Sequence, residues 1–229
     1  MTAHIGIVGC SAEGAALCYR TICQEGADRM GVHDHPEVSM HTHSLARYVE
    51  CLDRNDWHAV GALMLSSAEK LAAGGADFLI CPDNTIHSAL PEIMPNSPLP
   101  WLHIAEVVAA KAKSRGYQCI GLTGTRWLVD SDVYPEALAA AGMQYQRPSE
   151  AERDEIDRII MQELVRAHFD PDSVAYFQRV IAGMALSGCD AVVLGCTEIP
   201  LIINDDNASL PTLDSTRLLA RAALDKAAA

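Results

Sequence analysis

Residues 74–85 read GGADFLICPDNT and residues 187–198 read SGCDAVVLGCTE, and these two stretches set the architecture of the chain. In each stretch, a glycine marks the expected end of a helix, and Asp, a short apolar run and a polar loop follow it. The offset between them is 187 − 74 = 113 residues without a gap. A second pair, IGIVG at 5–9 and IGLTG at 120–124, has an offset of 120 − 5 = 115. The similar offsets predict a duplicated chain, with two α/β halves of about 110 residues.

Short apolar runs alternate with segments of helical spacing along the rest of the chain. Near-continuous apolar runs of this kind are typical of parallel strands covered on both faces. We expect strands at 4–9, 77–81, 119–123 and 191–195, and weaker ones near 38–41, 101–103, 143–146 and 210–213. We expect helices at 57–73, 104–113, 131–141, 151–168, 173–186 and 215–228. The alternation predicts an α/β fold of two pseudo-symmetric, parallel-sheet domains.

The proline-rich segment 91–100 is the best candidate for the crossing between the halves. We therefore expect an N-terminal domain of residues 1–98 plus 211–229, closed by the C-terminal helix, and a second domain of residues 99–210.

Composition and charge argue against nucleic-acid-binding and membrane proteins. The chain has 229 residues, of which 49% are hydrophobic, and its net charge is 17 − 30 = −13. Such an acidic surface disfavours nucleic acid and anionic membranes as partners. No apolar run reaches membrane-spanning length, and the start of the chain does not resemble a signal peptide. The eight cysteines include no C-x-x-C pair, so we expect core or surface thiols in a reducing, cytoplasmic compartment.

Asp83 and Cys196 occupy equivalent positions in the repeat, each just after a buried strand. Ligands of open α/β sheets bind at the carboxyl ends of the strands, so the two side chains would flank one cleft if the halves face each other. One proton-transfer group on each side of a ligand is what inversion of a carbon acid requires. Asn84, Thr85 and Thr197, with backbone N–H groups at the following helix starts, could hold a carboxylate.

These motifs resemble those of the cofactor-independent aspartate/glutamate racemase superfamily. GCTEIP at 195–200 looks like its second active-site motif, and PDNTIH at 82–87 is similar to its first, usually PCNTAH. The segments 5–19, 121–134 and 214–216 resemble its opening, its mid-chain segment and its C-terminal motif. The resemblance covers nearly the whole chain.

The resemblance implies two α/β domains with the active site in the cleft between them, no pyridoxal phosphate and no metal. Members of the family deprotonate the α-carbon with a pair of cysteines and are often dimers, so a homodimer is an expectation here. By position, the carboxylate-binding role falls on Asn84, Thr85, Thr125 and Thr197. Arg47 lies loosely where some members carry a substrate-binding arginine.

The chain also departs from the family pattern. Asp83 stands where the first catalytic cysteine is expected, and Cys81, two residues earlier, is an alternative only if the loop shifts. Ser11 and Glu13 replace part of the glycine-rich opening and would reshape the pocket. The family's second threonine after Thr125 is Leu128 here.

The sequence thus predicts an amino-acid racemase or epimerase that acts on a small, acidic amino acid through Asp83 and Cys196. Two alternatives stay open: a decarboxylase or isomerase that uses Cys196 as proton donor, and an inactive carboxylate-binding protein. Structural roles compete with chemical ones, because Asp83 could simply cap a helix and Cys196 could be a packed thiol. Two H-x-H pairs at 33–35 and 41–43 and the glycines at 6, 9 and 14 are weak signals for a metal and a dinucleotide.

Overall fold

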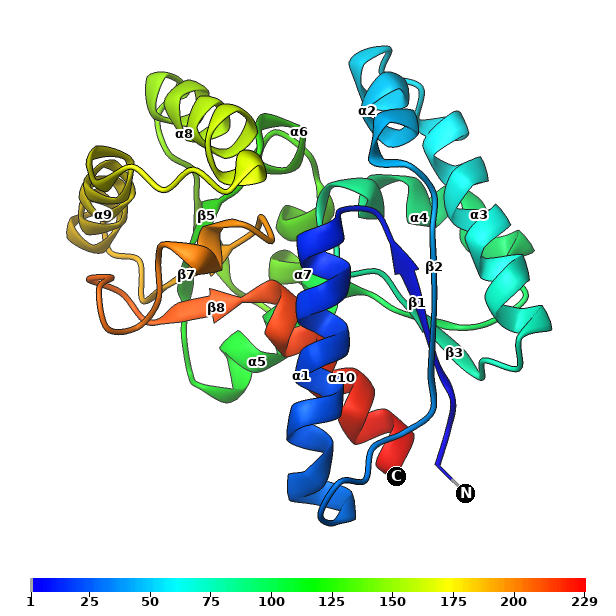
Figure 1. The fold of residues 1–229 in the computed structure, drawn as a ribbon. Helices are drawn as coiled ribbons and strands as arrows, with labels where there is room; N and C mark the ends of the chain where they lie inside the picture. Colours follow the sequence, from blue (N-terminus) through cyan, green and yellow to red (C-terminus); the bar gives the residue numbers. More distant parts are fainter. Residues whose placement is uncertain (1) are drawn as a thin grey trace. The chain divides into compact units, whose positions relative to one another are not determined.

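The computed structural model describes residues 2–229 and divides into two compact units. One consists of Met1–Val107 with Thr216–Ala229, and the other of Val108–Ser215. Each unit holds a four-stranded sheet in which all neighbouring strands are parallel (Figure 1). The strand orders are β2-β1-β3-β4 and β6-β5-β7-β8. The predicted α/β fold with two parallel sheets is therefore confirmed.

The sheet of the first unit has helices on both faces. Its strands are β1 (Ile5–Gly9), β2 (Val38–Thr42), β3 (Phe78–Ile80) and β4 (Trp101–Leu102). Its helices are α1 (Ala12–Met30), α2 (Leu45–Asp53), α3 (Trp57–Ala73), α4 (Leu90–Ile93) and α10 (Ser215–Ala228).

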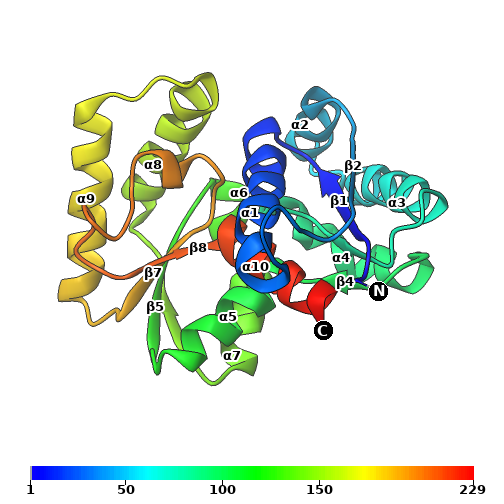
Figure 2. The ribbon, with the colours of Figure 1, turned by 60° about the horizontal axis from the view of Figure 1, so that its bottom comes forward.

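Alternate residues of each strand face opposite helical layers. Ile5 and Ile7 pack in one core cluster with residues of α1 and α10. Gly6 faces α3, where a Cβ atom would lie 3.3 Å from Cβ of Leu71. Figures 1 and 2 show α10 beside α1, and the ion pair between Arg221 and Glu25 joins these two helices.

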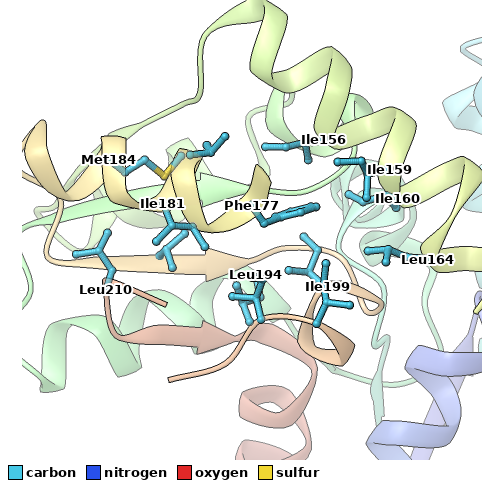
Figure 3. Packing of buried hydrophobic residues seen from close by; sticks show 14 of the residues in the cluster. Ile156, Ile159, Ile160, Leu164, Phe177, Ile181, Met184, Leu194, Ile199 and Leu210 are labelled. Carbon is cyan, nitrogen blue, oxygen red and sulfur yellow. The ribbon is translucent and has the colours of Figure 1, made fainter. Parts of the chain in front are cut away.

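The second unit repeats this plan. Its strands are β5 (Cys119–Thr123), β6 (Gln144–Gln146), β7 (Ala191–Leu194) and β8 (Thr212–Asp214). Its helices are α6 (Arg126–Val129), α7 (Val133–Ala140), α8 (Glu150–Gln162) and α9 (Pro171–Leu186), while α5 (Ile104–Ser114) crosses the boundary between the units. Figure 3 shows apolar side chains of α8 and α9 gathered over β7 and the segment after it, in a buried cluster that includes Phe177, Ile181 and Leu194.

Strand pairing confirms the duplication. Ile5 pairs with Phe78 in one sheet, and Ile120 pairs with Ala191 in the other. The equivalent residues differ by 120 − 5 = 115 and 191 − 78 = 113, the two offsets found in the sequence. The polar contacts are duplicated too. Asp77 accepts a hydrogen bond from the N–H of His4 at 2.7 Å, and Asp190 accepts one from the N–H of Cys119 at 3.0 Å.

Several helices differ from the prediction. Neither α1 nor α2 was anticipated, because the first carries many polar residues and only a weak apolar pattern and the second is short. The helix predicted over 151–168 ends earlier, at Gln162, and a 3₁₀ turn at Leu164–Arg166 follows it. Ala167 then takes a left-handed conformation with φ of 55°, which no α-helix can continue through. Among residues 2–229, no helix combines the length and the apolar character that crossing a membrane requires.

Candidate active site

The first candidate loop follows β3 and carries Asp83. It runs from Cys81 to Asn84 and enters a 3₁₀ turn at Thr85–Ala89 rather than the expected α-helix. The half-buried Asp83 accepts a hydrogen bond on Oδ1 from the N–H of Ile86 at 3.2 Å. The side chain of Asp83 therefore stabilises the start of this turn, which is one of the two roles that the sequence left open. A carboxylate has two oxygens, so capping through Oδ1 is compatible with proton transfer at Oδ2.

His87 fixes the backbone of the same loop. Its Nδ1 lies 2.7 Å from the carbonyl oxygen of Asp83, and its Nε2 lies 3.2 Å from the N–H of Ile104. A carbonyl can only accept and an N–H can only donate, so the proton of the neutral ring sits on Nδ1. Burial, with His103 stacked edge-on at 4.7 Å, lowers the pKa of His87 to about 3. At neutral pH the ring is uncharged and holds Asp83 through its main chain.

Cys81 is placed as a core thiol. Its side chain has no exposed surface, and its Sγ points to the carbonyl oxygen of Asp83 at 4.0 Å. Burial raises the pKa of Cys81 well above the usual thiol range, and the charge of Asp83 adds to this effect. A thiol held protonated in this way is a poor base. The arrangement disfavours Cys81 as a substitute for Asp83.

The second candidate loop follows β7 and carries Cys196. Gly195 begins it in a position with no room for a side chain, because a Cβ atom there would lie 2.4 Å from the carbonyl oxygen of Thr123. Cys196 is half-buried, and Thr197 is buried. A short 3₁₀ turn at Ile199–Leu201 follows. The close contact of β5 with Gly195 fixes where the thiol leaves the sheet.

Glu198 is the principal residue of this loop that sequence reasoning left without a role. Its side chain is buried, and Oε2 accepts hydrogen bonds from Cys196 Sγ at 2.9 Å and from Thr197 Oγ1 at 2.8 Å. Buried carboxylates need such partners, because desolvation of an unpaired charge is costly. The signal in the sequence was an acidic residue directly before the apolar Ile199–Pro200 step. The arrangement places a proton acceptor against the thiol.

Ser11 and Thr125 begin the first helix after β1 and after β5, respectively. Ser11 is the N-cap of α1, and its Oγ accepts from the N–H of Gly14 at 3.1 Å. Thr125 is buried and is the N-cap residue of α6. Leu128 is buried against the loop carrying Cys196, with its Cδ2 2.6 Å from the Cβ position built on Gly195. Leu128 therefore has a packing role in the second unit.

Asn84, Thr85 and Arg47 occupy the first unit. Asn84 is buried and Thr85 is half-buried, directly after Asp83. Arg47 is exposed on α2, and its NH1 lies 3.3 Å from Nδ1 of His43.

The histidines at 41 and 43 contact other side chains of the first unit. Their rings meet edge-on at 4.9 Å, and Nδ1 of His41 lies 2.9 Å from the hydroxyl of Ser67. Within residues 2–229, no three His, Cys, Asp or Glu side chains form a group suited to a metal ion.

Tyr48 is a second residue that sequence reasoning missed. It lies in α2 and is fully buried. Burial raises the pKa of its phenol, and the neighbouring Cys81, Cys10 and Asp83 raise it further. The phenol therefore stays protonated near the loop that carries Asp83. Its signal in the sequence was weak, because one tyrosine in a short amphipathic helix is usually a packing residue.

The comparison with known families covers almost the entire chain. The sequence profile of the Asp/Glu/Hydantoin racemase family matches residues 6–223. Among curated proteins, the broad specificity amino-acid racemase RacX of Bacillus subtilis (strain 168) is 24% identical over 161 residues, which cover 69% of this chain and 68% of RacX.

Solved structures give a similar result. A candidate Asp/Glu racemase from Yersinia pestis is 30% identical, with a TM-score of 0.91 over 98% of this chain and 99% of that one. An aspartate racemase homologue from Pyrococcus horikoshii OT3 has the same fold, with a TM-score of 0.86 at 23% identity over 100% of both chains.

Proposed function

Because this chain belongs to the Asp/Glu/Hydantoin racemase family, we propose that it interconverts the enantiomers of a small amino acid: of Asp83 and Cys196, one removes the α-proton and the other returns a proton to the opposite face. The observation that carries the proposal is the buried carboxylate of Glu198 at 2.9 Å from the thiol of Cys196. A packed core thiol has no need of a buried proton acceptor, whereas a thiol that must lose its proton during turnover does.

The proton balance closes with these three residues. Glu198 helps to remove the thiol proton, and the Cys196 thiolate then takes the α-proton from one face of the substrate. Asp83, in its protonated form, returns a proton to the opposite face. In the reverse direction the carboxylate of Asp83 takes the α-proton and the thiol of Cys196 returns one. The two directions need different protonation states, so we expect unequal rates from the two enantiomers.

Polar side chains of the candidate loops would bind the substrate. We assign its carboxylate to Asn84, Thr85, Thr125 and Thr197, with Ser11 and Arg47 as further contacts. Fixed N–H and O–H donors would stabilise the negative charge that develops when the α-carbon loses its proton. Aspartate and glutamate are the first substrates to test, because solved relatives include an aspartate racemase from Picrophilus torridus and glutamate racemases. Neutral and basic amino acids belong in the panel because RacX is described as having broad specificity.

Chiral chromatography tests this proposal. Each enantiomer of aspartate, glutamate, alanine, serine and lysine is incubated with wild type, Cys196→Ala and Cys81→Ala. We expect the opposite enantiomer to appear with wild type and Cys81→Ala, and not with Cys196→Ala. Loss of carbon dioxide from the substrate would point to a decarboxylase instead. Thermal stabilisation by a carboxylate ligand, without turnover of any compound, would instead support the alternative of an inactive carboxylate-binding protein.

A further inference from the structure

Two thiols outside the proposed active site face each other at the opposite end of the second sheet. Sγ of Cys119 lies 3.8 Å from Sγ of Cys189. Cys119 is the first residue of β5, and Cys189 follows the turn after α9 and precedes β7. Cys196 lies just beyond the opposite, carboxyl end of β7. We infer that Cys119 and Cys189 form an oxidation site, which a peroxide converts into a disulfide bond.

The backbone around the two cysteines is already held in place. The N–H of Asp190 donates to the carbonyl of Cys119 at 2.8 Å, and Oδ2 of Asp190 accepts from the N–H of Cys119 at 3.0 Å. The N–H of Cys189 donates to the carbonyl of Met184 at 3.0 Å, which closes the turn after α9. A disulfide needs a sulfur–sulfur distance of about 2.05 Å. Rotation of the two side chains, with small backbone shifts, can supply the remaining approach.

The two thiols differ in access to solvent, which sets the order of the steps. Cys119 is half-buried, whereas Cys189 is buried against the apolar cluster of α8 and α9. Burial, together with the neighbouring Cys119 and Asp190, raises the pKa of Cys189 to about 12. A peroxide therefore reacts with Cys119 first, and Cys189 then attacks the oxidised Cys119 to form the disulfide.

The chemistry balances with one peroxide. The Cys119 thiolate attacks one peroxide oxygen, the O–O bond breaks, and the leaving oxygen departs as hydroxide and becomes water. Cys119 is oxidised by two electrons to a sulfenic acid. The sulfur of Cys189 then attacks the sulfur of Cys119, the S–O bond breaks, and the hydroxyl leaves as water with the thiol proton of Cys189. Overall, two thiols and one hydrogen peroxide give one disulfide and two waters.

Peptide mapping tests the inference without reference to catalysis. The reduced protein is treated with one equivalent of hydrogen peroxide, remaining thiols are alkylated, and the protein is digested without reduction. We expect a cross-linked peptide that contains Cys119 and Cys189. In Cys189→Ser we expect no cross-link, and dimedone should trap the sulfenic acid at Cys119. Cys23→Ser, which removes another half-buried thiol, is the matched control and should keep the cross-link.

Thermal unfolding gives a second readout. The disulfide would close a loop between residues 70 positions apart in the chain. We expect oxidation to raise the Tm of wild type by about 5 °C or more and to leave that of Cys119→Ser unchanged. If Cys189→Ser unfolds, Cys189→Ala serves in its place. Recovery of both cysteines in alkylated form after peroxide treatment, or stable overoxidation of Cys119 without a cross-link, would overturn the inference.

Discussion

The thiol of Cys196 donates to Oε2 of Glu198 across 2.9 Å, and the hydroxyl of Thr197 donates to the same oxygen at 2.8 Å. Three consecutive residues after β7 thus form one hydrogen-bonded unit around a buried carboxylate. Gly195 sets its position, because β5 approaches too closely there for any side chain. The short apolar run and the polar loop of the sequence motif together orient the thiol and supply its proton acceptor.

Replacing Glu198 by Gln tests the acceptor. Glutamine has nearly the same shape and can still accept a hydrogen bond, but it cannot take the thiol proton. We expect kcat for racemisation to fall by about 10²- to 10⁴-fold, the usual contribution of a positioned proton acceptor. Steady-state kinetics measures the loss, and circular dichroism melting shows whether the variant is folded. A folded variant with kcat within about threefold of wild type would exclude this role for Glu198.

Two substitutions at Asp83 separate capping from proton transfer. Asp83→Asn keeps an oxygen that can accept from the N–H of Ile86, whereas Asp83→Ala removes it. We expect both variants to lose racemase activity. Only Asp83→Ala should lose stability, by about 1 kcal/mol, the typical contribution of an N-cap side chain. Urea unfolding and chiral chromatography measure the two effects. Full activity in Asp83→Asn would leave Asp83 with the capping role alone.

His87 makes stability depend on pH. Its pKa is about 3 in the folded protein, against 6.5 for an ordinary histidine, so the unfolded chain binds the extra proton first as the pH falls. The stability present above pH 6.5 is therefore lost progressively between pH 6.5 and 3. Between pH 7 and 5 this single group should cost about 2 kcal/mol.

The check is urea unfolding of wild type and His87→Gln at both pH values. Glutamine cannot titrate in this range, so the variant should lose about 2 kcal/mol less than wild type on going from pH 7 to 5. Equal pH dependence in the two proteins would mean that His87 is not the buried, neutral group described above.

Two glycines of the second unit should respond in opposite ways to alanine. At Gly195 a Cβ atom meets the carbonyl oxygen of Thr123 at 2.4 Å, so Gly195→Ala must displace the loop of Cys196. We expect a stability loss of about 1–3 kcal/mol together with a large loss of activity. At Gly183, exposed in α9, a Cβ atom has no neighbour within 4 Å. Gly183→Ala should gain about 0.5–1 kcal/mol, because alanine favours the helix. Thermal melting curves of Gly195→Ala and Gly183→Ala, compared with wild type, test the two predicted stability changes.

The strands were predictable because two separate pairs of similar segments show the duplication in the sequence. Residues buried on both faces of a parallel strand must be apolar, so the four central runs stand out without any other information. The offsets of 113 and 115 then identified which strands are equivalent, and the pairing of Ile5 with Phe78 and of Ile120 with Ala191 follows them. Loops that follow such strands are natural positions for chemistry, which is why the sequence predicts Asp83 and Cys196 as site residues.

The parts that could not be predicted depend on tertiary contacts. Helix α1 has a weak apolar pattern, and its buried face is made of small or polar residues such as Gly14, Ala15 and Thr21. It forms because Ser11 caps it and because α10 and the sheet cover it. Glu198 is similar, since an acidic residue before an apolar step can equally be a surface carboxylate or one folded back onto the thiol two residues earlier. The close approach of Gly195 to β5, which fixes the start of this loop, is a tertiary contact.

Exchange of the α-proton in D2O gives the sharpest test of proton abstraction by Cys196. Proton NMR follows the α-proton signal of each pure enantiomer of aspartate, and of the other panel substrates, in separate reactions with wild type and with Cys196→Ala. We expect both enantiomers to lose the signal with wild type as deuterium replaces the proton. With Cys196→Ala we expect the signal to persist for the enantiomer that Cys196 deprotonates, while Asp83 can still exchange the α-proton of the other enantiomer. An α-proton that survives with wild type for every amino acid of the panel, or exchange of both enantiomers with Cys196→Ala as fast as with wild type, would contradict carbon-acid chemistry at Cys196.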